Sequence, residues 1–311
     1  MSVHAYPAPQ KGQRGEVREG REAKEGRGFE IGRIRISIPK LNEDIEGGFP
    51  ERELILLTGP PGSGKTITAI NILADAIAQG MIAAYISSEM NSYQVRMQAR
   101  SVGIELPRFE DFRVDRDLDL NSPVFVDAYA FTEVSRHLAE EREKRKGEEG
   151  RRYVSPYSPE TFLAALDMLL SKVSSKAGGQ QPVKMLIVAD SISTYLSSAA
   201  VLARRFGVQI QSVLRRYSFG DRDRAPIHTT MILVSQISST TGTTYGFPIE
   251  HAVGGIIEFR LITPSKEGEE LKRIAYIKKM RYTNHYLGTY RVLIGYEDKD
   301  EKKYYPIYFK R

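Results

Sequence analysis

The residues from Gly59 to Thr66 form a motif that can bind the phosphates of a nucleotide. Glycines at these positions let backbone N–H groups turn toward phosphates, Lys65 supplies a positive charge for the outer phosphates, and the Thr66 hydroxyl can bind Mg²⁺. We predict a P-loop for ATP and Mg²⁺ that includes Ile67, and a chance glycine-rich turn is the alternative. The sequence Gly59-Pro60-Pro61-Gly62-Ser63-Gly64-Lys65-Thr66 matches the full pattern G-x-x-x-x-G-K-[ST].

The segments on either side of this motif have the patterns that a P-loop requires. Leu54–Leu57 is a continuous apolar run, typical of a strand that is buried on both faces. Apolar residues then recur at helical spacing after the motif, at Ile70, Leu73, Ala74 and Ile77. The sequence therefore places the motif between a strand and a helix, as a P-loop demands.

Three polar side chains follow other strand-like segments, and open α/β sheets bind ligands at such strand ends. Asp190 would hold Mg²⁺ through water, and Glu89 would orient the attacking water. Gln236 would sense the terminal phosphate. Either acid could instead cap the helix that follows it.

Alternating strand-like and helix-like segments predict an α/β fold, with helices on both faces of a mostly parallel sheet. After Gly255 the strand-like segments follow one another closely, which predicts an antiparallel extension of the same sheet. The earlier strands are expected at 54–57, 82–86, 185–189 and 231–234, and the later ones at 256–262, 273–279, 289–294 and 307–309.

Composition predicts one globular domain, at 29–311, after a disordered mixed-charge tail at 1–28. The chain has 311 residues, of which 41% are hydrophobic, and no segment long and apolar enough for a membrane span or signal peptide, so we expect a cytoplasmic protein without a membrane partner. The absence of cysteine excludes disulfides and thiolate metal sites. The net charge of +6 favours anionic partners, although nucleotide accounts for part of that excess.

These motifs, in this order and approximate spacing, resemble the RecA-fold ATPases of the archaeal RadA and KaiC group. The resemblance spans about Ile31 to Arg311 and includes two further details. The segment from Ile277 to His285 is similar to the Lys-Met-Arg-Gly-Thr-x-His segment of KaiC-type proteins, and Arg96 matches the arginine that stacks on adenine in RadA.

The resemblance implies roles for residues far from the P-loop. It implies that Glu89 helps to catalyse hydrolysis and that Lys279 and Arg281 reach the nucleotide of a neighbouring subunit. The expected assembly is a homo-oligomeric ring or filament with nucleotide at the subunit interface.

The chain departs from the family pattern at two positions. Met90 follows Glu89 where KaiC-type domains usually have a second glutamate, and Tyr282 stands where the Lys-Met-Arg-Gly segment has glycine. We therefore expect slow turnover. One ATPase domain disfavours a circadian-clock role, and residues 1–28 cannot form the helix-hairpin-helix domain that precedes RadA. The closest description is a single-domain KaiC-like ATPase or RadA paralogue.

We predict an ATP-binding and ATP-hydrolysing protein that acts in DNA recombination or repair, as an accessory that binds single-stranded DNA and works with a RadA-type recombinase. The loop after Gln236 contains Tyr245 and Phe247, which could stack on bases or could pack the loop onto the domain. The alternative function is a KaiC-like regulatory or signalling scaffold with little turnover and no DNA role. The dense charges of Arg136–Arg152 predict a solvated helix and an exposed loop.

Overall fold

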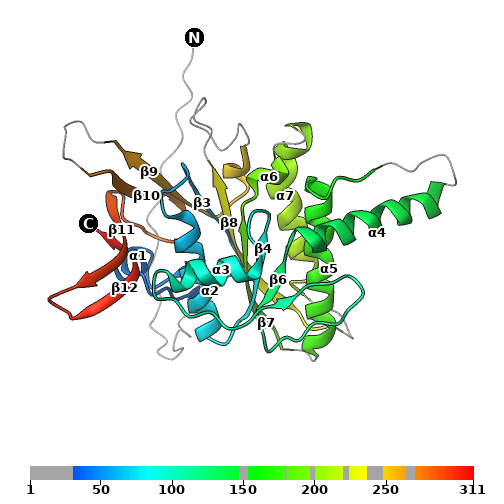
Figure 1. Ribbon diagram of the computed structural model, residues 1–311, viewed down its shortest axis with the longest axis horizontal. Coiled ribbons are helices and arrows are strands. Elements are labelled where there is room, and N and C mark those ends of the chain that lie inside the picture. Colours follow the sequence, from blue (N-terminus) through cyan, green and yellow to red (C-terminus); the bar gives the residue numbers. More distant parts are fainter. Residues whose placement is uncertain are drawn as a thin grey trace, which may run out of the picture. The chain divides into compact units, whose positions relative to one another are not determined.

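A ten-stranded sheet forms the centre of the fold (Figure 1). The computed structural model describes residues 31–146, 153–178, 181–196, 200–219, 224–236, 248–263 and 270–311, without the side chains of 145–146 and 200–204. The strand order is β12-β11-β10-β9-β3-β8-β7-β4-β6-β5. Its strands are β3 (Leu54–Gly59), β4 (Ile82–Ser87), β5 (Glu110–Asp111), β6 (Val124–Val126), β7 (Val183–Asp190), β8 (Ile227–Gln236), β9 (Gly255–Ile262), β10 (Lys272–Met280), β11 (Thr289–Asp298) and β12 (Lys303–Lys310).

The directions of the strands confirm the predicted sheet. Every neighbouring pair from β9 through β3, β8, β7, β4 and β6 to β5 is parallel, whereas β9 to β12 pair antiparallel. All six residues of β3 are buried, because neighbouring strands and helices cover the strand on every side. The continuous apolar run at 54–57 therefore has the burial that such a run predicts.

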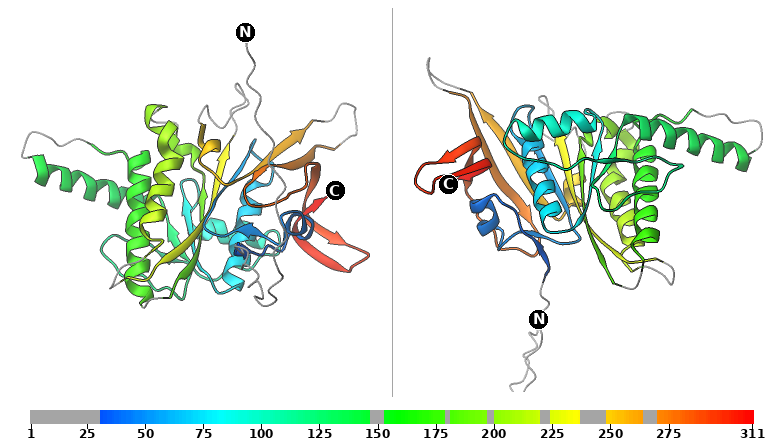
Figure 2. Two further views of the ribbon diagram at one scale, coloured as in Figure 1. Left: turned by 180° about the vertical axis from the view of Figure 1, so that it is seen from behind. Right: turned by 60° about the horizontal axis from the view of Figure 1, so that its bottom comes forward.

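Helices cover both faces of the sheet (Figure 2), and each face has its own apolar core. One core contains Ile70 and Leu73 of α2, and the other contains Phe162 and Leu166 of α5. The first face is covered by α1 (Pro39–Asp44), α2 (Lys65–Ala78) and α3 (Ser92–Arg100), and the second by α4 (Ala128–Lys146), α5 (Pro159–Ala177), α6 (Ser193–Leu196) and α7 (Ala200–Arg216). The 3₁₀ turn η1 (Pro248–His251) precedes β9.

The first described segment forms a small separate sheet. Ile34, Ile36 and Ile38 are buried in alternation with exposed Arg35 and Ser37, as the β-branched pattern predicts. Only β1 (Arg33–Ile34) forms a ladder here, with β2 (Phe49–Pro50), because α1 begins at Pro39. This short sheet pairs the first described strand with β2, which lies just before β3 in the chain.

The densely charged segment that begins at Arg136 is helical as far as the end of α4. Its side chains from Arg136 to Lys144 are exposed or half-exposed, as predicted, and α4 extends outward beyond α5 (Figures 1 and 2). Residues 147–152, the predicted tail at 1–28 and the loop with Tyr245 and Phe247 lie outside the described residues. None of the helices in the described ranges is long and apolar enough to cross a membrane.

Candidate nucleotide-binding site

The carboxyl ends of β3, β4, β7 and β8 lie side by side and bring most of the predicted site residues together. Gly59 is level with Gln236, and Ser87 is level with Asp190. A cavity of about 310 Å³ opens at this edge of the sheet. Its lining includes Glu89, Asp190, Gln236 and, from the P-loop, Pro61, Gly62, Gly64, Lys65, Thr66 and Ile67.

The backbone of the P-loop has the conformation that a phosphate site requires. Gly62 and Gly64 have φ values of +75° and +104°, a region that residues with a side chain rarely adopt. A Cβ atom at Gly59 would lie 2.5 Å from the carbonyl oxygen of Phe259, so the strand end also needs glycine. Because α2 begins at Lys65, the unpaired N–H groups of its first turn lie at the cavity and favour an anion there.

Lys65 places a partly desolvated ammonium group in this cavity. The side chain is buried, and Nζ donates to the carbonyl oxygen of Pro60 at 2.7 Å. Burial lowers the pKa of Lys65 to about 8, and the charges of Asp190 and Glu89 oppose that shift. The buried Ser63 Oγ has no hydrogen-bond partner among the residues that the structure describes. Both groups suit an anionic ligand with several acceptor oxygens.

Asp190 ends β7 next to the P-loop hydroxyl. Its carboxylate accepts a hydrogen bond from Tyr85 Oη at 2.9 Å, and the Thr66 hydroxyl lies close to it. Burial raises the pKa of Asp190, and the Thr66 and Tyr85 hydroxyls and the Lys65 ammonium oppose the shift. Asp190 belongs to the strand, and α6 begins only at Ser193, so the alternative that Asp190 caps the next helix is wrong.

The donor set fits Mg²⁺. Thr66 and Asp190 offer neighbouring oxygen ligands, which Mg²⁺ prefers. Within the described ranges, no group of three or more His, Asp or Glu side chains is arranged to hold a metal by itself. An ion held by one or two protein oxygens together with phosphate oxygens is the usual arrangement for Mg²⁺ at nucleotide sites.

Glu89 faces the cavity just beyond the end of β4. Its Oε1 accepts a hydrogen bond from Ser191 Oγ at 3.0 Å. Asn91, rather than Glu89, caps α3, since its side chain accepts from the backbone N–H of Gln94 in a capping box. The helix-cap alternative for Glu89 is therefore wrong. Met90 packs against the apolar core beneath α2 and does not line the cavity.

Gln236 and four residues that the sequence reasoning missed complete the cavity lining. The Gln236 N–H donates to Ser193 Oγ at 2.9 Å, which holds the end of β8 against α6. The four missed residues are Gln98, Ser191, Val234 and Ile294. Ser191 directly follows Asp190 and could have been found by adjacency, whereas nothing local marks Gln98 or Ile294.

Arg96 lies on α3 but does not line the cavity, which Gln98 of the same helix does. The Arg96 side chain is half-buried, and its buried Nε has no hydrogen-bond partner in the described part of the chain. The structure therefore does not bring Arg96 to the phosphate site. Its predicted contact with adenine stays a prediction.

The antiparallel extension supports the P-loop from behind. Arg273 of β10 donates from Nε to the carbonyl oxygen of Gly62 at 2.9 Å. A Cβ atom at Gly64 would lie 3.6 Å from Val292 and Ile294 of β11, so these side chains pack closely on the loop. The last strands of the chain thus fix the conformation of a loop far earlier in the sequence.

Lys279 and Arg281 lie at the opposite end of the sheet from the P-loop. Met280, between them, is level with Gly255, which in turn is level with Ile55 near the start of β3. Lys279 Nζ donates to the carbonyl oxygens of Glu250 and Val253, and burial together with nearby Arg281 lowers the pKa of Lys279. Neither residue lines the P-loop cavity.

Arg281 instead lines a second cavity, of about 150 Å³, with Arg52, Glu53 and Arg215 among its other lining residues. Burial raises the pKa of Glu53, and the Arg281 charge opposes that shift. The Arg281 Nη2 approaches the carbonyl oxygen of His251 at 3.4 Å. The lining of this second cavity therefore contains three arginines and one glutamate.

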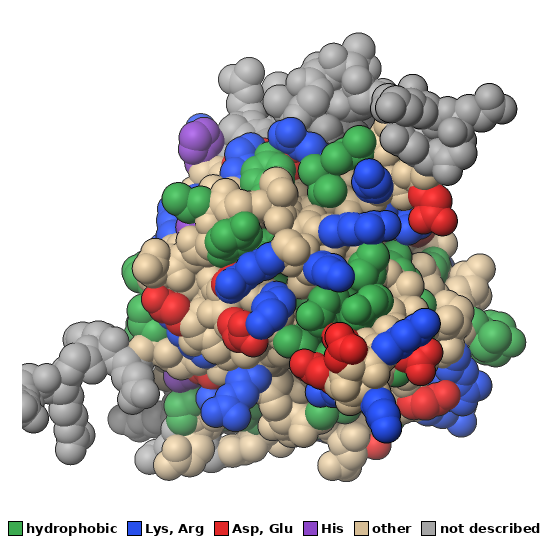
Figure 3. Space-filling model, turned by 90° about the vertical axis from the view of Figure 1, so that its left-hand side faces the viewer, with side chains coloured by type: hydrophobic (Ala, Val, Ile, Leu, Met, Phe, Trp, Pro, Cys, Tyr) green, Lys and Arg blue, Asp and Glu red, His purple; other side chains and the backbone are tan. Residues whose placement is uncertain are grey.

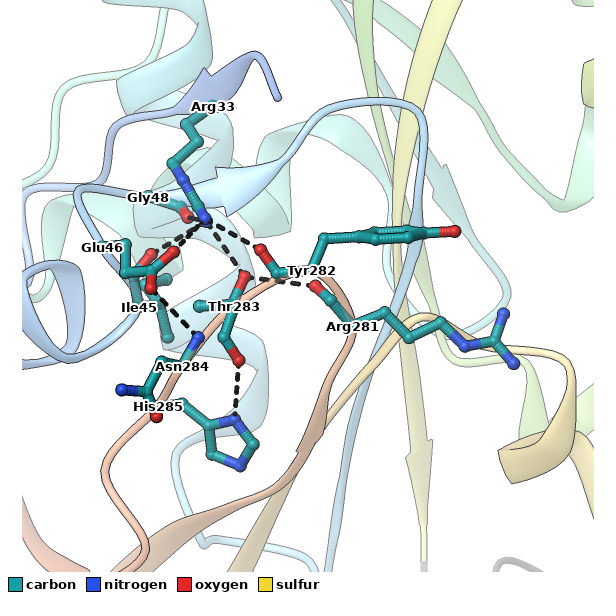
Figure 4. A network of polar contacts seen from close by, with 9 residues as sticks. All are labelled: Arg33, Ile45, Glu46, Gly48, Arg281, Tyr282, Thr283, Asn284 and His285. Carbon is teal, nitrogen blue, oxygen red and sulfur yellow. Dashed lines mark hydrogen bonds and ion pairs between the residues drawn. The ribbon is translucent and has the colours of Figure 1, made fainter. Parts of the chain in front are cut away.

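Tyr282 keeps the backbone conformation that glycine would provide. Its φ is +57°, in the left-handed region, and its side chain is exposed (Figure 4). The substitution therefore leaves the turn after Arg281 in place at a cost in strain. Tyr282 therefore adopts a backbone conformation that glycine adopts readily.

The sheet order, the P-loop and the converging strand ends define a P-loop nucleotide-binding protein of the RecA fold. A family model described as "ATPase: KaiC" matches residues 34–122 and 164–298. The chain belongs to this KaiC ATPase family.

Several proteins of similar sequence match most of this chain. A UPF0273 protein of Aeropyrum pernix is 30% identical over 275 residues, which cover 86% of this chain and 95% of that protein. A UPF0273 protein of Pyrococcus furiosus is 28% identical, with 88% and 97% covered. The crystal structure of a KaiC-like protein of Pyrococcus horikoshii matches with a TM-score of 0.55 and 22% identity over 86% of this chain and 96% of that one, which shows the shared fold.

Proposed function

We propose that this protein is a Mg²⁺-dependent ATPase that works as a homo-oligomeric ring or filament, with each nucleotide site shared between two subunits. The observation that carries the proposal is the division of the predicted residues between two ends of the sheet. Lys65, Glu89 and Asp190 line one cavity, whereas Lys279 and Arg281 lie at the far end. A single subunit therefore holds both halves of a site but cannot join them by itself.

Within the cavity each residue has a distinct task. Lys65 and the N–H groups of the loop bind the phosphates, while Thr66 and Asp190 hold Mg²⁺, which neutralises phosphate charge when bound. Glu89, oriented by Ser191 Oγ, accepts a hydrogen bond from the attacking water. Gln236 joins the cavity to the segment after β8, and its end position suits a sensor of the terminal phosphate.

Phosphate release from ATP by the purified protein, with and without Mg²⁺, tests this proposal. Mg²⁺-dependent release supports the ATPase. ATP binding without any release at any protein concentration would leave the regulatory or signalling scaffold as the function. One observation favours slow turnover. Met90 packs on the core, so Glu89 alone supplies a carboxylate to the cavity from the end of β4.

Replacing Glu89 by glutamine is expected to lower the rate of ATP hydrolysis by about 10² to 10⁴-fold, the usual contribution of a positioned general base. ATP affinity should stay within about twofold, because glutamine keeps the side-chain shape and the Ser191 contact. Single-turnover hydrolysis and calorimetric titration measure the two quantities. Glu105→Gln is the matched control, since Glu105 pairs with Arg100 on the exposed surface. An unchanged rate in Glu89→Gln would remove Glu89 from this role.

The second candidate function is single-stranded DNA binding, as an accessory of a RadA-type recombinase in recombination or repair. The observation in its favour is that β8 ends at Gln236, which lines the cavity, and that Tyr245 and Phe247 follow Gln236 closely in the sequence. Charge gives little further support. On the face that carries β10 to β12, lysines and arginines are mixed with acids and apolar side chains (Figure 3).

Replacing both Tyr245 and Phe247 by alanine is expected to weaken single-stranded DNA binding, because aromatic stacking contributes about 1–3 kcal/mol per base. ATP binding should not change. Fluorescence anisotropy with a labelled oligonucleotide at fixed salt measures the DNA affinity. Tyr153→Ala is the control, because Tyr153 is a highly exposed tyrosine elsewhere on the chain. Equal DNA affinity for the double variant and the unmutated protein would reject this loop as the binding segment.

A further inference from the structure

Arg33 joins the first described segment of the chain to the turn that follows β10 (Figure 4). Its Nη1 donates to Thr283 Oγ1 at 3.0 Å, and its Nη2 donates to the carbonyl oxygen of Tyr282 at 3.1 Å. The guanidinium also pairs with the carboxylate of Glu46. Its remaining acceptors are the carbonyl oxygens of Ile45 and Gly48, at 3.0 and 3.1 Å.

The geometry of the side chain explains why an arginine serves here. Only 17% of the Arg33 side chain is exposed, and its acceptors come from both the loop before β2 and the turn after β10. A guanidinium has several N–H donors in one rigid plane, whereas an ammonium group has three donors at a single point. Arg33 therefore fixes the distance and the angle between two segments that are remote in sequence.

The turn that Arg33 holds contains a strained residue. Tyr282 has a φ of +57°, a conformation that persists only where surrounding contacts enforce it. On one side of Tyr282 the Thr283 hydroxyl donates to the carbonyl oxygen of Arg281 at 3.1 Å, and on the other the N–H of Asn284 donates to Glu46 Oε1 at 3.1 Å. These contacts and the hydrogen bonds from the Arg33 guanidinium hold the turn on both sides of Tyr282.

Backbone contacts on either side of Arg281, which do not involve its charged group, set the direction of its side chain. The N–H of Arg281 donates to the carbonyl oxygen of Gly254 at 2.8 Å, which anchors the residue to the start of β9. In Figure 4 the Arg281 side chain points away from Arg33, so the two guanidinium groups do not share acceptors. We propose that Arg33 is a positioning residue that holds the turn after β10 so that Arg281 projects toward the nucleotide of a neighbouring subunit.

This inference rests on the proposed shared site, and mixing experiments separate the two. Arg33→Gln removes the guanidinium, and Arg33→Lys keeps the positive charge but cannot donate to acceptors on both segments at once. We expect both variants to bind an ATP analogue normally and to hydrolyse ATP about 10²-fold more slowly when assembled, the loss that a small misplacement of a catalytic group produces. The control is Arg35→Gln, an exposed arginine two residues away, which should keep the unmutated rate.

Complementation distinguishes positioning from general destabilisation. Arg33→Gln mixed with Glu89→Gln should regain activity, because a mixed interface pairs an intact Glu89 with an intact Arg33 and Arg281. Arg33→Gln mixed with Arg281→Ala should stay inactive, because both changes affect the same side of the interface. Adding Tyr282→Gly to Arg33→Gln should restore part of the rate, since glycine adopts the turn without enforcement.

Hydrogen exchange provides a readout that does not depend on turnover. In Arg33→Gln the amides of Tyr282 to Asn284 should exchange faster, while those of β3 and α2 stay protected. Failure of Arg281→Ala and Glu89→Gln to complement each other would reject the shared site itself. If that pair complements, then full activity of Arg33→Gln, or its complementation by Arg281→Ala, would overturn the positioning role alone.

Discussion

Replacing Lys65 by alanine is expected to weaken ATP binding by about 10 to 10²-fold. The ammonium is buried beside Asp190 and Glu89, so without it the phosphates meet two carboxylates and no side-chain cation from the loop. A hydrogen bond to a charged group contributes about 1.5–3 kcal/mol, and each 1.4 kcal/mol is about tenfold in affinity. The backbone of the P-loop should be unchanged, because its glycines set its conformation.

Calorimetric titration with a non-hydrolysable ATP analogue measures this effect. Lys184→Ala is the matched control, since Lys184 is an exposed lysine that pairs with Glu51 near the start of β7. The control should bind the analogue like the unmutated protein. Equal affinity for Lys65→Ala and the control would contradict the assignment of the P-loop.

The affinity for ATP should also fall as the pH rises above about 8. Burial lowers the pKa of Lys65 to about 8, so the free protein loses the ammonium charge in this range. Phosphate favours the charged form, so binding above that pH takes up a proton, and affinity decreases by up to about tenfold per pH unit. Titrations between about pH 7 and pH 9.5 test this slope. Lys65→Ala should lack it, and a slope that survives in Lys65→Ala would assign the proton to another group.

The parts of the site that the sequence predicts are those that depend on local pattern. Leu54–Leu57 gives a buried strand, and the P-loop follows it directly, so strand, loop and helix are all encoded within one short stretch. Asp190 and Gln236 were predicted because each ends an apolar run, and parallel strands end at one edge of a sheet. No long-range information was needed to place them together.

Other contacts of the same site depend on strand register across the sheet. Ile294 and Arg273 reach the P-loop only because β9 pairs with β3 and the later strands then fold back antiparallel. Nothing within a few residues of either one signals a contact with Gly62 or Gly64. Their types, an isoleucine and an arginine on a half-exposed sheet, are ordinary for any edge of a sheet.

The two departures from the family pattern illustrate a further limit of sequence. Tyr282 in place of glycine suggests an altered turn, yet its φ of +57° retains the turn, because contacts from Arg33 and Thr283 surround it. Met90 in place of a glutamate suggests a weakened active site, and the structure places that side chain against the core. A residue type thus predicts a side chain's chemistry but not the contacts that fix its backbone.

Replacing Arg281 by alanine is expected to lower assembled ATPase activity by about 10³ to 10⁵-fold, the range for an arginine supplied by a neighbouring subunit. Arg281 lies near the start of β3, whereas the P-loop follows the other end of β3. The charge of Arg281 can therefore assist hydrolysis only at another subunit's site. Activity per subunit of the unmutated protein should accordingly rise with protein concentration. Arg291→Ala, at an exposed arginine of β11, is the control and should keep the unmutated rate.

Mixing Arg281→Ala with Glu89→Gln gives the decisive measurement. Each variant alone should be inactive, because every interface lacks either the cation or the carboxylate. In the mixture some interfaces join Glu89 of one subunit to Arg281 of the next, so activity should return in proportion to their number. If activity per subunit is instead constant across the range of assembly and the mixture stays inactive, then the site is not shared. Lys279 and Arg281 would then be charges without a role in hydrolysis, and the interpretation of them as charges on an edge strand is wrong as well, because β10 pairs with β9 and β11.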